Sequence, residues 1–434
     1  MKSSTTLTAD SFAEFFVKKT DGIRATTDGA PPASFREYSS GTLFQSFRKL
    51  EIEDTMQFIR SSPLKQCATD PIPTWLLKDC SDLLAPCITQ IINCSLVTGS
   101  VPIALKQAYD TPLMKKMGLD ENTAANYRPV SNLSVLSKLL ERVVSQQIER
   151  YLSIEGHFPP HQSAYRKHHS TETVLTRVCS DIITQLDKGD CALMAFLDLS
   201  AAFDTVDKSI LINRLSRTFG VRGTTLEWFT SYLTGRTEHV LYNGVKSPVR
   251  TTEYGVLQGS VLGPLLFVLY TADLEVIACQ HGVEAHFYAD DSQMYIFSKT
   301  SDVTTAQDQL LRCLDDIAEW MKSNRLSLNP SKTQFMWCAT SRRQGQLSTA
   351  PIEFCGEKIR PETSVRNLGV TVDSALTFQP HISSVVSSCF YQLRRMKSSL
   401  KLLPFHIART VVNCFIISRI DYCCLLYTSD AADE

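Results

Sequence analysis

Residues 284–297, EAHFYADDSQMYIF, are the part of the sequence that decides the fold. Aromatic and branched residues lie on both sides of two adjacent acids, Asp290 and Asp291, and such residues favour extended strands. We therefore predict a β-hairpin whose two strands are joined at this Asp-Asp step. Taken alone, an Asp-Asp step is more often a plain hairpin loop than a metal site.

A third acid ends an earlier apolar run. Residues 191–200 read CALMAFLDLS, a short continuous apolar stretch that ends at Asp198. This pattern is typical of a fully buried central strand. If that strand pairs with the hairpin, Asp198 approaches Asp290 and Asp291, and three carboxylates close together are unfavourable unless cations lie between them. The three acids are therefore candidate ligands for two divalent ions, an arrangement suited to transferring a nucleotidyl group to a 3′ hydroxyl.

The surrounding patterns predict an α+β fold. Apolar residues recur at helical spacing between about residues 73 and 151 and again over 304–321. After the strand at 191–200, residues 208–220 show a helical face that ends at a glycine, and Asp204 and Asp207 are candidate caps for that helix. Residues 26–34, TTDGAPPAS, mark a loop or linker near the start of the chain.

The composition limits the class of protein. With 434 residues and 43% hydrophobic content, the chain is long enough for two or three packed units. Apolar stretches such as residues 261–270 contain about ten residues, well short of the roughly 20 needed to cross a bilayer. The N-terminal residues lack the apolar core of a secretory signal. We therefore expect an intracellular protein with no membrane partner.

The net charge of the chain argues weakly against a nucleic-acid partner, whereas one local cluster of basic residues is compatible with such a partner. The formal net charge is -1, whereas phosphate contacts depend on clustered lysine and arginine. Residues 391–421 form such a cluster on a segment predicted to be helical, with Asp421 as the one acid. Its basic members are Arg394, Arg395, Lys397, Lys401, Arg409 and Arg419. Either this stripe faces a phosphate backbone or it is an ordinary solvated helix face.

Three motifs in order carry a family resemblance. FLDLSAAFDTVD (196–207), GVLQGSVLGPLLFVLY (255–270) and FYADD (287–291) resemble the successive A, B and C motifs of reverse transcriptases. Together with NYRPVSNLSVLSKLLERVV (126–144) and QSAYRKHHSTET (162–173) upstream, the sequences of these motifs are similar to those of non-LTR retrotransposon polymerases, especially the Jockey and chicken-repeat clades. The resemblance covers about residues 67–423.

This resemblance implies a right-hand polymerase with fingers, a ferredoxin-like palm and a helical thumb. It implies an RNA-directed DNA polymerase that uses an RNA template, a DNA primer or target, dNTPs and Mg²⁺, with Mn²⁺ as a second possible ion. Asp198 and Asp290 would be the principal metal ligands, with the Leu199 carbonyl nearby and Asp291 completing the set. Such an element works as a ribonucleoprotein in the nucleus and cytoplasm.

The resemblance also assigns nucleotide-binding roles. Phe203 matches the aromatic residue that lies under the incoming sugar and excludes a 2′ hydroxyl, although a packed core phenylalanine is the alternative. Gln258 and Gly259 match the turn that reaches the nucleotide and template, where glycine lets the backbone approach a ligand. Arg166, assisted by Lys167, resembles the arginine that grips the triphosphate. This sequence has AYR where many relatives have GFR, which retains the basic residue.

Two downstream segments resemble further motifs. Lys332, in NPSKT, resembles the lysine that protonates or neutralises the departing pyrophosphate. A solvated turn lysine is the alternative. Residues 365–373, VRNLGVTVD, resemble the strand-turn that grips the primer end.

The resemblance suggests four segments. Residues 1–65 are expected to be an N-terminal linker remnant, residues 66–375 the fingers and palm, residues 376–423 a partial helical thumb, and residues 424–434 a non-native tail. The last eleven residues, CLLYTSDAADE, look like a translated sequencing adapter. We expect the natural protein to continue past Cys423 and to have an endonuclease before the polymerase.

Three interpretations remain at this stage. The first is an active RNA-directed DNA polymerase that copies its RNA from a nicked target, a reaction known as target-primed reverse transcription. The second is a catalytically inactive relic that binds nucleic acid, which the presence of Asp198, Phe203, Asp290 and Asp291 disfavours. The third, an intron-encoded maturase, calls for an RNA-binding region after the thumb, which the sequence does not show.

Overall fold

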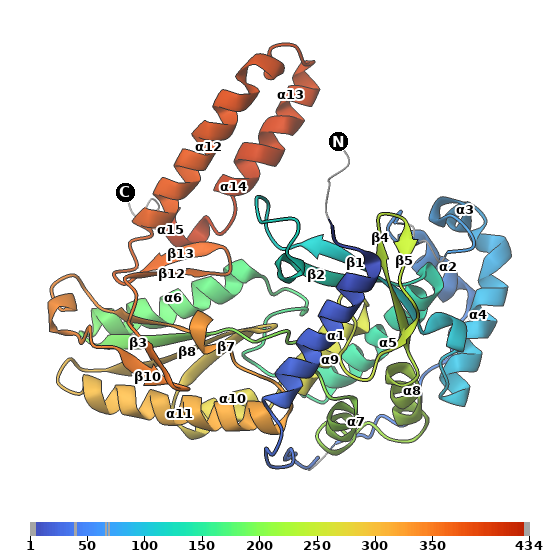
Figure 1. The fold of residues 1–434 in the computed structure, drawn as a ribbon, viewed down its shortest axis with the longest axis horizontal. Coiled ribbons are helices and arrows are strands. Elements are labelled where there is room, and N and C mark those ends of the chain that lie inside the picture. Colours follow the sequence, from blue (N-terminus) through green and yellow to red (C-terminus); the bar gives the residue numbers. More distant parts are fainter. Residues whose placement is uncertain (1–5, 39–40, 66, 68–69, 429–434) are drawn as a thin grey trace. The chain divides into compact units, whose positions relative to one another are not determined.

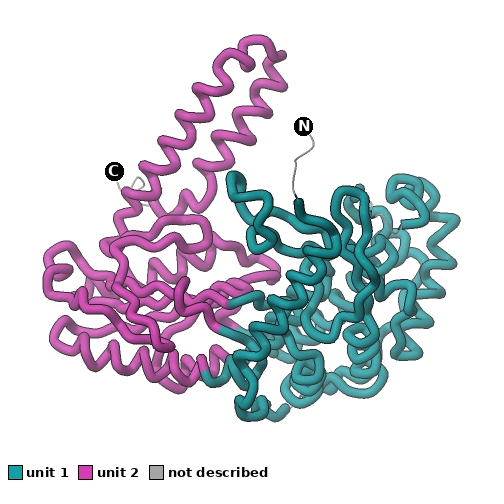
Figure 2. Tube along the Cα trace, in the orientation of Figure 1, with its two compact units in different colours: residues 1–159, 200–273, 319–327 teal, residues 160–199, 274–318, 328–434 magenta. Residues whose placement is uncertain are grey.

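The computed structural model describes residues 6–38, 41–65, 67 and 70–428. They divide into two compact units, each made of three chain segments (Figure 2). Unit 1 comprises Met1–Pro159, Ser200–Asp273 and Glu319–Ser327, and unit 2 comprises Pro160–Leu199, Leu274–Ala318 and Leu328–Glu434. These boundaries differ from the four consecutive segments expected from the sequence, because both units are assembled from segments far apart in the chain.

Unit 2 is built around an antiparallel four-stranded sheet with the order β7-β8-β3-β9. Helices or helix-containing segments make the two long connections, so the chain follows the split β-α-β-β-α-β pattern. Figure 1 shows α6 on one side of this sheet and α10 and α11 on the other. The elements are β3 (Cys191–Leu197), β7 (Glu284–Tyr288), β8 (Asp291–Ser298), β9 (Gln334–Cys338), α6 (Thr171–Asp187), α10 (Leu274–Gln280) and α11 (Val303–Ser323).

The predicted central strand and hairpin are both present. β3 lies between β8 and β9, and almost every one of its residues is buried, as its continuous apolar sequence indicates. The face of β3 that carries Ala192 and Met194 packs against α6 in one hydrophobic cluster. From α6, Val174, Val178 and Ile182 belong to this cluster. Complete burial of an aliphatic side chain of this size contributes about 1.5–3 kcal/mol. This face therefore holds α6 against the sheet.

The C-terminal part of unit 2 contains two small hairpins and a helical pair. β12 and β13 pair through Ser364–Asp373 in the segment where a strand-turn is expected. The helices after residue 376 match the helical character predicted for that segment. The elements are β10 (Ile352–Phe354), β11 (Glu357–Ile359), β12 (Ser364–Asn367), β13 (Val370–Asp373), η3 (Pro330–Lys332), η4 (Gln344–Gln346), α12 (Gln379–Leu400), α13 (Phe405–Val412), η5 (Asn413–Ile417), α14 (Ser418–Ile420) and α15 (Leu425–Thr428).

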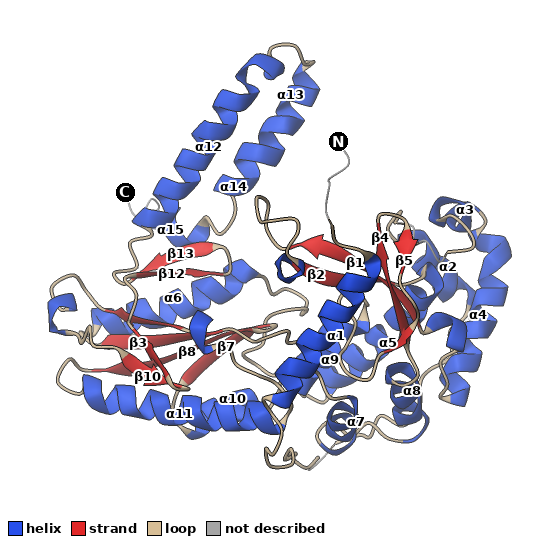
Figure 3. Cartoon of the chain, viewed as in Figure 1, coloured by secondary structure: helices blue, strands red, loops and turns tan. Residues whose placement is uncertain are grey.

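Unit 1 combines a second sheet with helices (Figure 3). β1 pairs antiparallel with β2 and parallel with β4, and β4 also pairs with β5 and β6. The strands are β1 (Gln107–Met114), β2 (Tyr127–Asn132), β4 (Thr237–Tyr242), β5 (Val245–Lys246) and β6 (Arg250–Thr251). The helices are α1 (Ala9–Ala25), α2 (Ile52–Ser61), α3 (Thr74–Asp79), α4 (Ser81–Thr98), η1 (Ile103–Leu105), η2 (Ala124–Asn126), α5 (Val135–Ile154), α7 (Lys208–Arg217), α8 (Gly223–Leu233) and α9 (Leu262–Tyr270).

The N-terminal segment is more ordered than the expected linker. α1 begins with a capping box between Thr8 and Ser11. Phe12 is fully buried, and its ring lies 4.9 Å from the rings of both Tyr127 and Tyr242. The Ser/Thr-rich start and the nearby Pro-Pro step suggested a linker, but the apolar residues of α1 have partners on β2 and β4 that lie more than 100 residues away in the sequence.

Among the residues that the structure describes, one stretch is long and apolar enough to cross a membrane. It covers Leu262–Gln280, and most of it is buried in the protein. The stretch is divided into α9 and α10, of 9 and 7 residues. Each is too short to span a bilayer, which needs about 20 helical residues. It therefore gives weak evidence for a membrane segment.

If α1 is an integral part of unit 1, replacing Phe12 with alanine removes a fully buried ring. We expect Phe12→Ala to destabilise unit 1 by about 3–5 kcal/mol. Denaturant unfolding followed by circular dichroism measures the change. Glu14→Ala, on the exposed side of the same helix, is the control and is expected to have little effect. Equal stability of the two variants would show that α1 does not contribute to the core.

Candidate active site

Pairing of β3 with β8 brings two of the predicted acids opposite each other. Leu197 at the end of β3 pairs with Ser292 on β8. This is the last pair of the ladder, and the next positions on the two segments are Asp198 and Asp291. Side chains of directly opposed residues lie on the same face with Cβ atoms about 5 Å apart. The sheet register therefore positions both carboxylates at one end of the α6 side of the sheet.

The third acid lies in the tight turn between β7 and β8. Tyr288 pairs with Asp291, so Ala289 and Asp290 form a two-residue loop. This corrects the sequence prediction slightly, because Asp291 begins β8 and is not part of the loop. Ala289 has a φ of 59°, in the left-handed region that non-glycine residues rarely adopt. A positive φ at the first loop residue is typical of the primed turns of β-hairpins.

The electrostatics of Asp290 and Asp291 show that the acids affect one another. Burial raises the pKa of Asp290, repulsion from Asp198 raises it further, and the Lys332 ammonium partly offsets these effects. Partial burial, followed by repulsion from Asp290 and Asp198, raises the pKa of Asp291 to about 6, although the residue is exposed to solvent at the end of the sheet. Both carboxylates therefore resist ionisation and favour a neighbouring positive charge.

Lys332 supplies one such charge. Its Nζ donates to Asp198 Oδ2 over 2.9 Å. The Asn329 amide donates to the Asp198 carbonyl and Leu328 forms a bridge with Leu199, so this segment is anchored beside the end of β3. With 64% of the lysine side chain exposed, the ion pair contributes at most about 1 kcal/mol. Lys332 is thus available to change partners at little cost.

The metal-ligand prediction named Asp198, Leu199, Asp290 and Asp291. Within the described parts of the chain, no group of three or more His, Cys, Asp or Glu side chains has metal-binding geometry. The acids are brought together, but Asp198 is paired with Lys332. Two backbone hydrogen bonds flank Leu199: the Asp198 carbonyl accepts from Asn329, and the Ser200 amide donates to Ser327. The Leu199 carbonyl takes part in neither of these two bonds. Carboxylate and carbonyl oxygens suit a hard divalent cation, and the raised pKa values of two acids fit such a partner.

Arg166 and Lys167 follow a segment that runs along β7. The Phe287 amide donates to the His161 carbonyl, and the Ser163 amide donates to the Phe287 carbonyl. Arg166 is half-buried and has a long contact of 3.4 Å from Nη1 to the Pro160 carbonyl, whereas Lys167 is exposed. Tyr165, between this segment and Arg166, has a φ of 58°. Partial burial and then the nearby Asp290 carboxylate raise the pKa of Tyr165.

The other predicted nucleotide-binding residues belong to unit 1. Phe203 stacks on Phe267 at 4.6 Å but remains partly exposed, so it is not a fully packed core residue. The Gln258 carbonyl accepts from the Ser131 amide over 2.7 Å. A Cβ at Gly259 would lie 2.4 Å from the Ser131 carbonyl oxygen, so any other residue would clash with this strand. The close approach explains the glycine at this turn.

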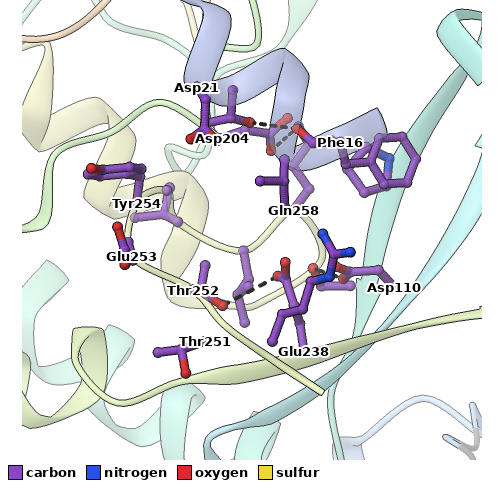
Figure 4. A pocket seen from close by; sticks show the side chains of 18 residues that line it. Phe16, Asp21, Asp110, Asp204, Glu238, Thr251, Thr252, Glu253, Tyr254 and Gln258 are labelled. Carbon is purple, nitrogen blue, oxygen red and sulfur yellow. Dashed lines mark hydrogen bonds between the residues drawn. The ribbon is translucent and has the colours of Figure 1, made fainter. Parts of the chain in front are cut away.

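Unit 1 also contains a cavity of about 340 Å³ that includes Gln258. Figure 4 shows Gln258 and Asp204 on one side of it and Asp110 with Glu238 on another. Gln258 Nε2 donates to Asp204 Oδ1 over 3.1 Å, which fixes the side-chain amide. Burial raises the pKa of Asp204 to about 6, and burial followed by repulsion from Glu238 raises that of Asp110 well above its usual value.

The roles predicted for two further acids are resolved differently. Asp207 caps α7, because its carboxylate accepts from the amides of Ser209 and Ile210. The prediction for Asp204 was wrong, since its carboxylate binds the Gln258 side chain instead. Gln162 and Tyr165 were not predicted to belong to the site, although both lie within QSAYR, residues 162–166.

Comparison with known proteins agrees with the motifs. The profile described as "Reverse transcriptase (RNA-dependent DNA polymerase)" matches residues 114–372. This match covers more than half of the chain, and the chain belongs to the reverse transcriptase family.

The relatives specify the group within that family. The chain is 30% identical to "Probable RNA-directed DNA polymerase from transposon BS" of Drosophila melanogaster over 81% of its length and 38% of the relative. It is 27% identical to "RNA-directed DNA polymerase from mobile element jockey" of the same species over 80% of its length and 37% of the relative. A probable polymerase from the Drosophila melanogaster X-element is 31% identical over 63% and 29%. These similarities identify a non-LTR retrotransposon reverse transcriptase that spans less than two fifths of the length of these relatives.

The raised pKa of Asp291 leads to a pH-dependent prediction. The Asp291 carboxyl has a pKa of about 4 in the unfolded chain and about 6 in the folded protein. Its ionisation therefore destabilises the fold, and the protein loses stability as the pH rises from about 4 through about 6. We therefore expect Asp291→Asn to unfold at a higher temperature than the natural sequence at pH 7 without divalent ions. The difference should shrink as the pH falls towards 4.

Thermal unfolding between pH 4 and 8 in a chelator tests this expectation. Asp308→Asn, at an exposed position of α11, is the control and should show no such pH-dependent difference. Adding Mg²⁺ at pH 7 should stabilise the natural sequence more than Asp291→Asn, because the cation relieves the repulsion. A difference between the proteins that does not vary with pH would contradict the electrostatic explanation.

Proposed function

We propose that this chain is the polymerase part of a non-LTR element and extends a primer 3′ hydroxyl with dNTPs on an RNA template. The observation that carries the proposal is the convergence of Asp198, Asp290 and Asp291 at one end of the unit 2 sheet. The chain is a reverse transcriptase, and these three acids lie in its A and C motifs at adjoining strand ends. Carboxylates placed in this way suit nucleotidyl transfer, because they can hold the divalent ions that the reaction needs. Target-primed synthesis, in which a nicked DNA end serves as the primer, is the reaction proposed for the complete element.

We assign the parts of a right-hand polymerase as follows. The unit 2 sheet, with its split β-α-β-β-α-β order, is the ferredoxin-like palm. The helices from α12 to α14 form the thumb, and unit 1 supplies the fingers. The strand order and the helical segment after residue 376 support these assignments.

The divalent cofactor of this family is proposed to be Mg²⁺, with Mn²⁺ able to replace it. Asp198, Asp290 and the Leu199 carbonyl would hold it, with Asp291 adjacent. When bound, it lowers the pKa of the primer hydroxyl and stabilises charge on the phosphates. Bond formation joins the primer oxygen to the α-phosphorus of the dNTP, and the bond to pyrophosphate breaks.

Lys332 is proposed to act on the leaving group. Its ammonium pairs with Asp198 through a partly exposed contact, so changing partners requires little energy. An ammonium near the departing pyrophosphate either donates a proton or neutralises the charge that develops there. Arg166, assisted by Lys167, is proposed to bind the triphosphate, for which a guanidinium suits two phosphate oxygens at once.

Unit 1 is proposed to select the nucleotide. Phe203 presents a partly exposed ring held from behind by Phe267, which suits contact with a deoxyribose and steric exclusion of a 2′ hydroxyl. Gln258 and Gly259 would contact the nucleotide and template. The bond from Gln258 to Asp204 supports this role because it holds the amide in one orientation.

The helical segment is proposed to contact the phosphate backbone. The basic residues of the stripe are all exposed on α12–α14 and the loop after α12, as phosphate binding requires. Its members are Arg394, Arg395, Lys397, Lys401, Arg409 and Arg419. The RNA template and DNA primer would be its partners, in a ribonucleoprotein of the nucleus and cytoplasm.

Primer extension on an RNA template with dNTPs and Mg²⁺ tests the proposed activity. We expect extension by the natural sequence and a loss of at least about a thousandfold in Asp290→Ala, since the charge-stabilising ligand is removed. Asp308→Ala, exposed on α11, should retain full activity. Absent extension, or extension that Asp290→Ala does not reduce, would favour the inactive nucleic-acid-binding relic.

Replacing Phe203 tests sugar selection separately. We expect Phe203→Ala to incorporate ribonucleotides at least about tenfold more efficiently relative to deoxynucleotides, because the steric barrier to the 2′ hydroxyl is removed. Phe203→Tyr keeps the ring and should retain the natural preference. The measurement is the ratio of kcat/KM for dNTP and rNTP on one primer-template. An unchanged ratio in Phe203→Ala would assign the ring to packing alone.

A further inference from the structure

The loop that carries Asp290 depends on a hydrogen bond from outside its own hairpin. Ala289 is buried, and its φ of 59° lies in a region that costs an L-residue free energy relative to the right-handed conformation. A buried amide also needs an acceptor. The Ala289 amide donates to Oε1 of Gln162 over 3.0 Å, so the acceptor comes from a residue 127 positions earlier in the chain.

Gln162 is itself fixed in place. It is 4% exposed, and the same Oε1 accepts from the Ala164 amide over 3.0 Å. Its backbone forms a parallel bridge with Phe287, immediately before the end of β7. The two backbone hydrogen bonds of His161 and Ser163 with Phe287 secure it on both sides. One oxygen therefore connects the loop to a segment that is already bound to the sheet.

A contact with helix α10 also holds this segment in place. His161 Nδ1 lies 2.6 Å from Glu275 Oε1 on α10, which packs against β7. The chain then reaches Arg166 four residues after Gln162. A shift in the Gln162 side chain would therefore remove the acceptor of the loop that carries Asp290.

We propose that Gln162 is a positioning residue that holds the Ala289–Asp290 loop in the conformation required for catalysis. Gln162 acts through the loop backbone and does not touch substrate. Its role rests on the proposed polymerase function, because the loop matters only if Asp290 serves catalysis. A side-chain amide oxygen in a buried site suits this task because it accepts hydrogen bonds without adding a charge beside three carboxylates.

The test compares two substitutions of one kind. Gln162→Met keeps the length of the side chain but removes the acceptor oxygen. Gln293→Met is the matched control, because Gln293 is 1% exposed on β8 and neither polar atom of its side chain has a hydrogen-bond partner among the described residues. Gln162→Glu retains an acceptor oxygen and serves as the conservative variant.

Hydrogen exchange tests the structural part without depending on activity. Peptides that cover residues 284–297 should exchange at least about tenfold faster at the Ala289 amide in Gln162→Met than in the natural sequence, and Gln293→Met should match the natural sequence there. The global unfolding temperatures of the two methionine variants should agree. Unchanged protection in Gln162→Met would overturn the proposal.

Steady-state primer extension tests the functional part. Gln162→Met should lower kcat about 10–100-fold, the range typical when a supporting residue behind metal ligands is lost. Its KM for dNTP should remain within about twofold, and its half-maximal Mg²⁺ concentration should rise. Gln162→Glu should recover part of kcat, and Gln293→Met should retain nearly all of it.

The outcomes separate the two proposals. If the natural sequence does not extend primers, the polymerase function fails, and faster exchange in Gln162→Met still demonstrates the loop contact. If the natural sequence is active but Gln162→Met keeps its kcat, or Gln293→Met loses as much as Gln162→Met, the positioning role is overturned.

Discussion

Mutual repulsion among three carboxylates is the constraint on which the rest of unit 2 depends. Asp198 and Asp291 are opposed by the register of β3 and β8, and Asp290 occupies the adjoining loop. A shift of one residue in this register would turn the side chains of β3 that pack against α6 to the opposite face of the sheet. The free energy of α6 packing therefore maintains an arrangement of acids that is unfavourable by itself. Lys332 reduces this penalty through Asp198, and a divalent cation would reduce it further.

The acids and the central strand could be predicted from the sequence because their signals are local. An apolar run that ends in an acid and an aromatic hairpin around Asp290 each need only a few neighbouring residues to be recognised. The order of the motifs then gave the family, which the comparison with known proteins supports. The helical character of residues 391–421 was likewise predicted from the sequence, and helices are present there.

Other features depended on contacts between distant residues and had no local signal. Phe12 looks like part of a linker until Tyr127 and Tyr242 are brought beside it. Asp204 stands where a helix cap is expected, but Gln258 from another segment takes its carboxylate. Gln162 lies in a recognised motif, yet its contact with Ala289 joins residues 127 positions apart. The pairing of Lys332 with Asp198 is also nonlocal, since it joins residues 134 positions apart in the sequence.

The interleaved order of the two units has a consequence for how the chain acquires its structure during synthesis. The first residue of β3, Cys191, must wait for Ser298, 107 positions later, before the β3–β8 ladder can close. β9 comes later still, and unit 1 is incomplete until Glu319–Ser327 has been made. The apolar β3 segment is thus exposed on the ribosome for many residues, at a stage when unpaired strands are prone to aggregate. Early binding of a chaperone to the β3 segment would therefore favour productive folding of the nascent chain.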